Sequence, residues 1–348
     1  MLKNLFLCFF VVTVLLLTLG GRETVQSASP KEAEFYKGKV VDGIVPYKTG
    51  GGYDNWVRAI SLFFGKYAGG ATLVTKNMPG AGGLVGTNRL YTADPNGLTI
   101  GILNASGLMQ AVLTETSGVK FDLLKFTWLG RLTSDQKIIC VSPKSKFKTI
   151  EAMKQSTKPV KFGAPGLGSS MFLEAALVAQ AMGIRIDLIT GYETSEEVDL
   201  AIIRGEIDAA TGSFASKIDT VKNGDMALVA QFGNVKEADL AKTPNLGDFP
   251  GLSSDSKQLL DLLVAMGESG RPMAGPPGMH PERSKFLQET LKKIVQDPEF
   301  LQLAKKQQMD VIYLPPEELF KIIGKGVSLS PSLKNRLKEI LAKYQPKK

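Results

Sequence analysis

Two glycine-rich turns, each set between a strand-like run and a helix-like run, constrain the fold more than any other feature of the sequence. The first turn, Gly50–Asp54, follows the β-rich run Val40–Pro46. The second, Gly163–Ser170, follows the short run Val160–Phe162. Because a helix start carries free N–H groups and the positive end of the helix dipole, each turn predicts an anion-binding helix start. Together they predict one anion held from two sides.

Both turns carry residues that are suited to cap the following helix. Asp54 is the expected N-cap of the first helix, in which apolar residues recur at helical spacing from Trp56 to Tyr67. Ser169 or Ser170 is expected to cap the second helix, an apolar run that ends near Met182. Glycine turns precede helices in many α/β proteins, so either turn alone is equally compatible with a purely structural role.

Strand-like and helix-like runs alternate along most of the chain. One alternating block extends from about Lys39 to Cys140, and a second extends from Val160 to Phe232. This alternation predicts parallel sheets with helices on their faces.

The C-terminal part contains too few strands for a sheet of its own. Helices are expected from Pro281 to about Val295 and from Pro298, with one strand at Val311–Tyr313. This part is therefore expected to return to the first domain, giving two α/β lobes joined by two crossings with a ligand between them. The expected lobes are residues 29–140 with 267–348, and residues 141–266.

The first 28 residues have the pattern of a secretory signal. Lys3 precedes the apolar run Leu5–Leu19, and small residues follow around Val25–Ala28. Because about 15 residues are short for a membrane-spanning helix, cleavage near Ala28 and a periplasmic location are expected, with an uncleaved N-terminal anchor as the alternative. Cys140 is then the lone cysteine, and its apolar neighbours predict a buried strand residue.

Several functional classes are disfavoured by the composition. The formal charge of +8 comes from lysines mixed with acidic residues, which is typical of solvated helix faces and not of a nucleic-acid-binding surface. Ser169 stands where a phosphate-binding P-loop needs lysine. The single histidine, His280, precedes Pro281 at an expected helix start, a capping position. No cofactor, metal site or catalytic group is expected.

Ordered motifs along the chain are similar to those of one known family. Ile44–Asp54 resembles a Pro-Gly-Gly-x-x-Asp loop, Val74–Gly83 resembles an Asn-x-Pro-Gly-Ala-Gly-Gly run, and Asp94–Ile100 resembles the turn and strand that follow. Weaker matches lie at Gly166–Ser169, Arg204–Asp208 and Gly275–Gly278. The family is that of the periplasmic substrate-binding proteins of tripartite tricarboxylate transporters, also called the TctC/Bug family.

This resemblance implies a type II periplasmic-binding fold whose two lobes close over a small carboxylate-bearing solute. It also implies a monomer that delivers the solute to the membrane permease subunits of such a transporter. The carboxylate would be held by backbone N–H groups and waters, without a basic side chain. By matching position, the expected ligand-binding residues are Gly51, Gly52, Tyr53 and Asp54 in one jaw and Gly168, Ser169 and Ser170 in the other. Residues expected at strand ends facing the cleft are Asn104, Ser106, Tyr192 and Ser213.

Two departures from the family pattern bear on the ligand. Tyr53 replaces a small or hydroxyl residue, which predicts a narrower pocket or stacking on a ring-bearing solute. The segment Thr190–Thr194 differs from the commoner Pro-Tyr-x-Gly pattern, so the far end of the ligand stays open. Two alternative functions also remain: presentation of a bound ligand to a membrane sensor kinase, and an exported enzyme that acts on a carboxylated substrate.

Overall fold

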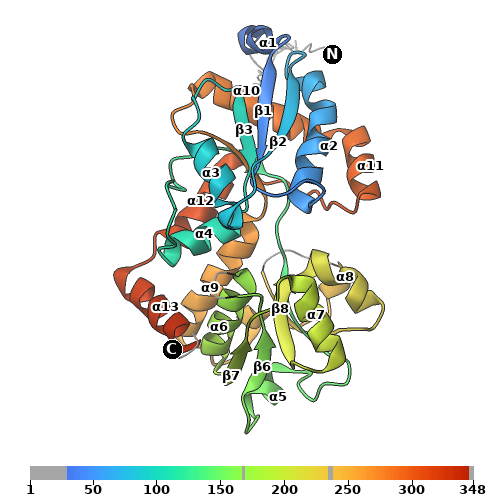
Figure 1. Cartoon of the computed structure of the whole chain (residues 1–348), viewed down its shortest axis with the longest axis vertical. Coiled ribbons are helices and arrows are strands. Elements are labelled where there is room, and N and C mark those ends of the chain that lie inside the picture. The colour runs from blue at the N-terminus through green and yellow to red at the C-terminus, as the bar shows by residue number, and fades with distance from the viewer. Residues whose placement is uncertain (1–29, 167–168, 234–237, 345–348) are drawn as a thin grey trace, which may run out of the picture.

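The computed structural model describes residues 30–166, 169–233 and 238–344. Two α/β lobes are stacked along its long axis, each built around a five-stranded sheet (Figure 1). The expected secretory signal lies outside the described residues. Within them, no helix combines the length and the apolar character needed to cross a membrane.

The sheet of the first lobe has three parallel strands on one side and an antiparallel strand inserted beside them. β1 pairs in parallel with both β2 and β3, whereas β10 runs antiparallel to β3 and β4. In spatial order, the strands are β2 (Thr72–Asn77), β1 (Val40–Val45), β3 (Thr99–Ile102), β10 (Pro272–Gly275) and β4 (Thr127–Arg131).

Successive side chains along each strand point to opposite faces of the sheet, and a layer of helices packs on each face. In β1, Val41 and Val45 enter the core beneath α2, α10 and α11, while Ile44 enters the core beneath α3 and α4. The helices of this lobe are α1 (Pro30–Tyr36), α2 (Gly52–Tyr67), η1 (Ala81–Gly83), α3 (Leu84–Tyr91), α4 (Ala105–Leu113), α10 (Pro281–Gln296), α11 (Pro298–Lys306) and α12 (Pro316–Val327).

The second lobe repeats this arrangement with a different part of the chain. In spatial order, its strands are β7 (Ile186–Ile189), β6 (Val160–Gly163), β8 (Ala209–Ser213), β5 (Lys137–Val141) and β9 (Ala227–Phe232). β5 is antiparallel to both of its neighbours. The helices are α5 (Ile150–Lys154), α6 (Ser170–Met182), α7 (Ser195–Arg204), α8 (Phe214–Lys222), η2 (Ala238–Leu240) and η3 (Leu246–Asp248).

β5 shows why this lobe needs an apolar run instead of an alternating one. Ile138 and Cys140 pack with α7 and α8, whereas Ile139 and Val141 pack with α6 and α9 (Ser254–Ser269). All four side chains are fully buried, because helices cover both faces of the sheet. The expectation that Cys140 is a buried strand residue is confirmed.

The expected parallel pairing is confirmed for β2, β1 and β3 and for β7, β6 and β8, but β10 and β5 are antiparallel, and the first lobe boundary also differs. β10 and β5 each follow a crossing between lobes, so each enters its sheet from the opposite end and runs antiparallel. The first crossing lies between Arg131 and Lys137, so the expected boundary at Cys140 falls inside β5. The boundary was misplaced because a local sequence pattern does not indicate which sheet a strand joins.

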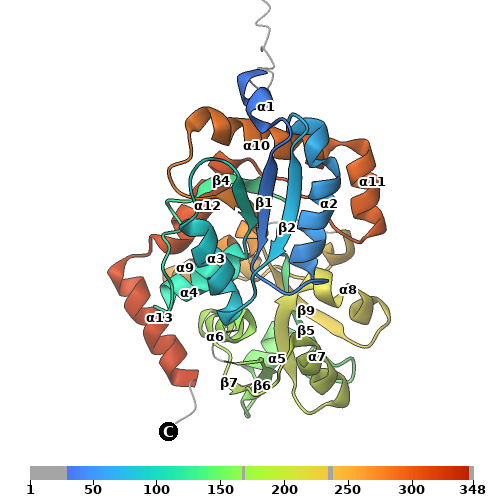
Figure 2. The ribbon, with the colours of Figure 1, turned by 45° about the horizontal axis from the view of Figure 1, so that its top comes forward.

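The C-terminal helices tie the lobes together. α9 packs against α6 of the second lobe and against α4 and α12 of the first. α13 (Pro331–Tyr344) lies beside α6 although its neighbour in sequence, α12, packs on the first lobe (Figures 1 and 2). The expected strand at Val311–Tyr313 was wrong: these residues belong to no strand, and the next residue, Leu314, forms an isolated antiparallel bridge with Arg131.

Candidate ligand-binding site

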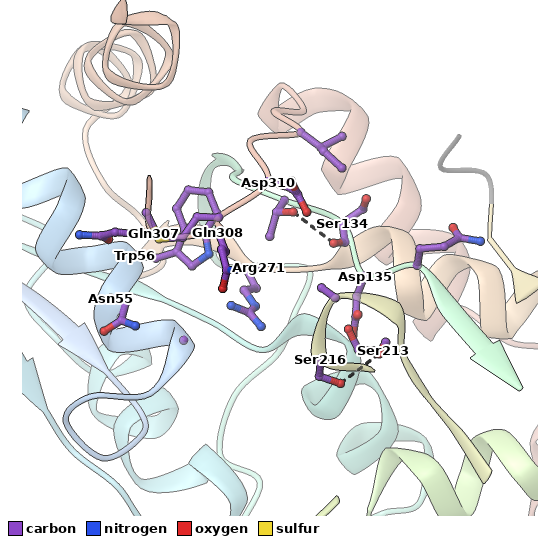
Figure 3. A pocket seen from close by; sticks show the side chains of 16 residues that line it. Asn55, Trp56, Ser134, Asp135, Ser213, Ser216, Arg271, Gln307, Gln308 and Asp310 are labelled. Atoms are coloured by element: carbon purple, nitrogen blue, oxygen red, sulfur yellow. Dashed lines mark hydrogen bonds between the residues drawn. The ribbon is translucent and has the colours of Figure 1, made fainter. Parts of the chain in front are cut away.

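A pocket of about 190 Å³ lies where the two lobes meet the crossings (Figure 3). We call it the hinge pocket. Its walls come from the start of α2, both crossings, the start of α8 and the loop after α11. The lining residues are Gly52, Asn55, Trp56, Thr133, Ser134, Asp135, Gln136, Ser213, Ala215, Ser216, Arg271, Gln307, Gln308, Met309, Asp310 and Ile312.

The two crossings that form its floor are bonded to each other. The N–H of Leu132 donates to the carbonyl of Arg271 at 3.0 Å, and the N–H of Arg271 donates to the carbonyl of Thr133 at 3.0 Å. Gly270, between α9 and the second crossing, adopts φ +51°, which favours glycine. The pocket is therefore built on the segments about which the lobes would move.

Asp54 does not cap the first N–H groups of α2, which lie at the hinge pocket. This residue was expected to be the N-cap, which was wrong: the N-cap is Gly51, which has no side chain with which to bond the first N–H groups. The Asp54 carboxylate is only 1% exposed and accepts hydrogen bonds from Gly50 N at 2.8 Å, Arg58 Nε at 2.8 Å and Asn77 Nδ2 at 2.9 Å. Asp54 therefore fixes the preceding turn and leaves the helix start uncapped.

The hydrogen bonds around Asp54 also set its ionisation. Burial by itself would raise the pKa of this carboxyl, but the bonds from Arg58, Gly50 and Asn77 outweigh burial and hold the pKa below its usual value of 3.8. Asp54 is therefore charged at neutral pH and serves the structure of the turn.

Arg271 extends from the second crossing into the hinge pocket (Figure 3). Its guanidinium lies 4.7 Å from the centre of the Tyr53 ring, a cation–π contact. A side chain at position 52 would place Cβ only 2.8 Å from Arg271 Nη1, so Gly52 leaves the space that the guanidinium occupies. In the described part of the chain, no carboxylate forms an ion pair with Arg271.

The Tyr53 ring, in α2 of the first lobe, contacts both Arg271 and a second tyrosine. It lies 4.6 Å from the Tyr47 ring, centre to centre, and the Tyr47 hydroxyl accepts a hydrogen bond from Asn104 Nδ2 at 3.0 Å. Burial raises the pKa of Tyr47, so its hydroxyl stays protonated at neutral pH. Tyr47 and Arg271 already contact the Tyr53 ring, and Tyr53 lines neither pocket described here, so the narrower pocket and the stacking on a ring-bearing solute both stay predictions.

Asp135, the acidic residue on the first crossing, shares one lysine with Glu174. Lys137 Nζ lies 2.7 Å from Asp135 and 3.1 Å from Glu174. Burial alone would lower the pKa of Lys137, but these two charges outweigh it and hold the pKa well above its usual value. Burial by itself would raise the pKa of Asp135, but Lys137 and, to a smaller extent, the charge of Arg271 together outweigh burial and hold this pKa below its usual value.

A second pocket, of about 330 Å³, lies between η1, α4 and α6, and we call it the α4–α6 pocket. Asn104, Gln110 and Ser170 line it. Ser169 is the N-cap of α6 and accepts from Phe172 N, which confirms the expected cap. Gln110 Nε2 donates to the carbonyl of Ser169 at 3.2 Å, a direct bond between the lobes.

Of the two pockets described here, the first glycine-rich turn lines the hinge pocket and the second lines the α4–α6 pocket, and their shared grip on one anion stays a prediction. Gly52 faces the hinge pocket together with Ser213, while Asn104 and Ser170 line the α4–α6 pocket. Tyr53 lies beside Arg271. The second turn's Gly168 lies outside the described residues.

The remaining expected residues line neither pocket. Gly51 is exposed at the N-cap of α2, and Tyr192 is half-buried against Gly163. Ser106 is buried in α4, and within the described chain its hydroxyl has no hydrogen-bond partner.

Sequence reasoning missed Arg271 and the loop after α11. The available signal was Gly270-Arg271-Pro272, a cation at the expected second crossing. The expected carboxylate cradle lacks a basic side chain, and the arginine in this pocket differs from that expectation. A second signal appears only in the structure: Gln308, in the loop after α11, adopts φ +54°, and strained residues of this kind cluster at functional sites.

The histidine and the cysteine to which the sequence assigned structural roles both occupy structural positions. His280 is the N-cap residue of α10 with Pro281 at its first position, which confirms the expected placement. Burial raises the pKa of the Cys140 thiol to about 12, so it stays protonated and unreactive at neutral pH. Within the described residues, no group of histidine, cysteine and acidic side chains is placed to hold a metal ion.

Comparison with known proteins identifies the family. The family model of the tripartite tricarboxylate transporter family receptor, TctC, matches residues 64–337. The chain belongs to this family. Among curated TctC/Bug relatives, Protein BugT of Bordetella pertussis is 22% identical over 230 residues, which is 65% of this chain and 70% of BugT.

Solved structures show the same two-lobed fold. A TctC solute-binding protein from Polaromonas, without ligand, superposes with a TM-score of 0.71 at 23% identity, covering 88% of this chain and 99% of that one. Rhodopseudomonas palustris Rpa4515 with adipate superposes with a TM-score of 0.63 at 16% identity, covering 87% and 97%. The chain thus has the fold of the periplasmic solute-binding proteins of the TctC/Bug family.

Proposed function

We propose that this protein is a periplasmic receptor that captures a small carboxylate-bearing solute between its lobes. As a monomer, it then delivers the solute to the membrane permease of a tripartite tricarboxylate transporter. The observation that carries the proposal is the composition of the hinge pocket, whose walls come from both lobes and both crossings. Rotation about the crossings would open or close such a pocket, so binding and lobe closure are coupled.

Three groups of full or partial positive charge in the lining of the hinge pocket support an anionic solute, which would bind there beside the carboxylates of Asp135 and Asp310. The uncapped start of α2 and the start of α8 both line it, and both point partial positive charge at its interior. Arg271 adds a full positive charge between them. The adipate bound by a structural neighbour is consistent with a carboxylate as the solute.

Delivery requires an extracytoplasmic location, for which the sequence offers a signal at residues 1–28. We propose that this segment directs export and is removed near Ala28. Mass spectrometry of the protein purified from the periplasmic fraction tests the cleavage. An intact N-terminus on membrane-bound protein would instead support the uncleaved anchor.

Thermal unfolding of ligand-free protein against a panel of carboxylates tests the binding function. A solute at about 100 times its dissociation constant should stabilise the folded protein by roughly 2.7 kcal/mol. Solutes carried through purification are first removed by unfolding and refolding. A refolded protein that responds to no acid in the panel would refute carboxylate capture.

Two bulky substitutions locate the bound solute. Ala215→Trp places an indole in the hinge pocket from the exposed start of α8, and Ser170→Trp does the same in the α4–α6 pocket. We expect Ala215→Trp to abolish binding in a folded protein and Ser170→Trp to leave most of the affinity. The reverse pattern would move the site to the α4–α6 pocket.

Co-purification tests delivery to the permease. Ligand-loaded protein should bind the permease subunits in detergent more tightly than ligand-free protein, because closure changes the surface that both lobes present. Equal binding in the two states would contradict a receptor that signals its loaded state.

A further inference from the structure

We propose that Arg271 binds the carboxylate of the captured solute and that the hinge pocket selects acids with a single carboxylate. This inference rests on the proposed function, because it names the anchoring residue and the solute class of the same site. The family resemblance implied a cradle of backbone N–H groups and waters. In this chain, the Arg271 guanidinium lines the pocket as well.

The surroundings of Arg271 hold its guanidinium in place without an ion pair to any described carboxylate. The guanidinium lies 4.7 Å from the centre of the Tyr53 ring. Gly52, which has no side chain, leaves the space in which Arg271 Nη1 lies. Stacking on a ring leaves the N–H groups at the guanidinium edge free, and that edge matches a carboxylate in a two-bond arrangement. The first N–H groups of α2 lie beside it and add further donors.

The pocket offers one positive charge and two negative ones. Of its described lining residues, Arg271 is the sole base, and Asp135 and Asp310 are the acids. Asp135 shares Lys137 with Glu174, whereas Asp310 is exposed and, in the described chain, has no ion-pair partner. A solute with one carboxylate satisfies Arg271 and leaves its other end facing Asp310.

A second carboxylate on the solute would be unfavourable at that other end. It would find no second cation there, and the charge of Asp310 would repel it. A hydroxyl, amide or ammonium group would instead donate to Asp310 or to the side chains of Gln308 and Asn55. The pocket volume of about 190 Å³ favours a small acid.

Matched pairs of a diacid and its half-amide test this selectivity, because the pair differs in one carboxylate and almost nothing in shape. Calorimetric titration of the refolded, ligand-free protein would use malonate, succinate, glutarate and adipate, each beside its monoamide. In the pair that binds best, we expect the monoamide to bind at least about tenfold tighter than the diacid.

Three variants assign the effect to residues. Arg271→Gln should weaken binding of the best monoamide by at least about tenfold, because a charge-assisted pair is lost. Asp310→Asn, at an exposed position, should narrow the difference between diacid and monoamide. Arg204→Gln, at the exposed end of α7 and outside both pockets, is the matched control and should leave affinity unchanged.

The outcomes separate this inference from the proposed function. A parent protein that binds diacids as tightly as monoamides, or a folded Arg271→Gln protein with parental affinity, overturns the inference while acid capture stands. Because Arg271→Gln loses the contact with Tyr53, circular dichroism and the unfolding midpoint establish that it is folded. A parent protein that binds none of the acids overturns both proposals.

Discussion

Replacing Asp54 by alanine should cost about 3 kcal/mol of folding stability, although this residue was expected to contact ligand. The buried carboxylate accepts three hydrogen bonds, from Gly50 N, Arg58 Nε and Asn77 Nδ2. The three residues that donate these bonds are each at least partly exposed, so water can replace the lost acceptor. Each lost hydrogen bond should therefore cost about 1 kcal/mol of stability, and not the larger penalty of a buried donor left without a partner.

The matched control is Arg58→Ala, which removes one partner from the same group. Arg58 is 51% exposed and supplies one of the three bonds, so its loss should cost at most about 1 kcal/mol. For a chain of this length that unfolds cooperatively, about 3 kcal/mol lowers the unfolding midpoint by roughly 5 °C. Thermal unfolding of ligand-free protein, followed by circular dichroism at pH 7, measures both variants.

The pH dependence follows from the depressed pKa of Asp54. Because its folded pKa lies below the unfolded value of 3.8, the stabilisation is fully present above that pH and is lost as the pH falls through the folded pKa. The difference between parent and Asp54→Ala should therefore be constant from pH 7 to about 5 and shrink below about 3.8.

Two results would refute this reasoning. Equal midpoints for Asp54→Ala and Arg58→Ala would show that the three hydrogen bonds do not stabilise the turn. An Asp54→Ala protein with parental stability and no affinity for the solute would instead make Asp54 a direct ligand contact, as the family resemblance implied.

Further expectations concern the crossings and the core. Gly270→Ala should destabilise the protein by clearly more than the roughly 1 kcal/mol expected for Gly278→Ala, because both adopt positive φ but a new Cβ at Gly270 would collide with the Thr133 carbonyl oxygen; equal denaturation midpoints would contradict this. Lys137→Met should cost about 3–5 kcal/mol by leaving two carboxylates without their buried partner, and an unchanged urea midpoint would count against that role. The Cys140 thiol, whose pKa burial raises to about 12, should react with a thiol reagent only at the rate of unfolding, so rapid modification of folded protein would show that it is accessible.

Local chemistry determined the parts of this protein that the sequence predicted. The helix after the first turn follows from the spacing of Trp56, Ile60 and Phe64, and these side chains are buried in α2 as expected. The Ser169 cap and the His280–Pro281 helix start depend on neighbours within four residues, so they could be predicted from sequence alone.

Only the tertiary structure decided which distant segments meet. β5 and β10 are short apolar runs that would suit either sheet, and the crossings place them antiparallel at interior positions. The same packing turned the Asp54 carboxylate back to Asn77, placed Gly52 and Ser213 in the lining of one pocket, and brought Arg271 beside Tyr53. These contacts join residues that lie far apart in the chain. Local propensity fixes a helix start, but the direction of a side chain and the charge of a pocket depend on which elements pack together.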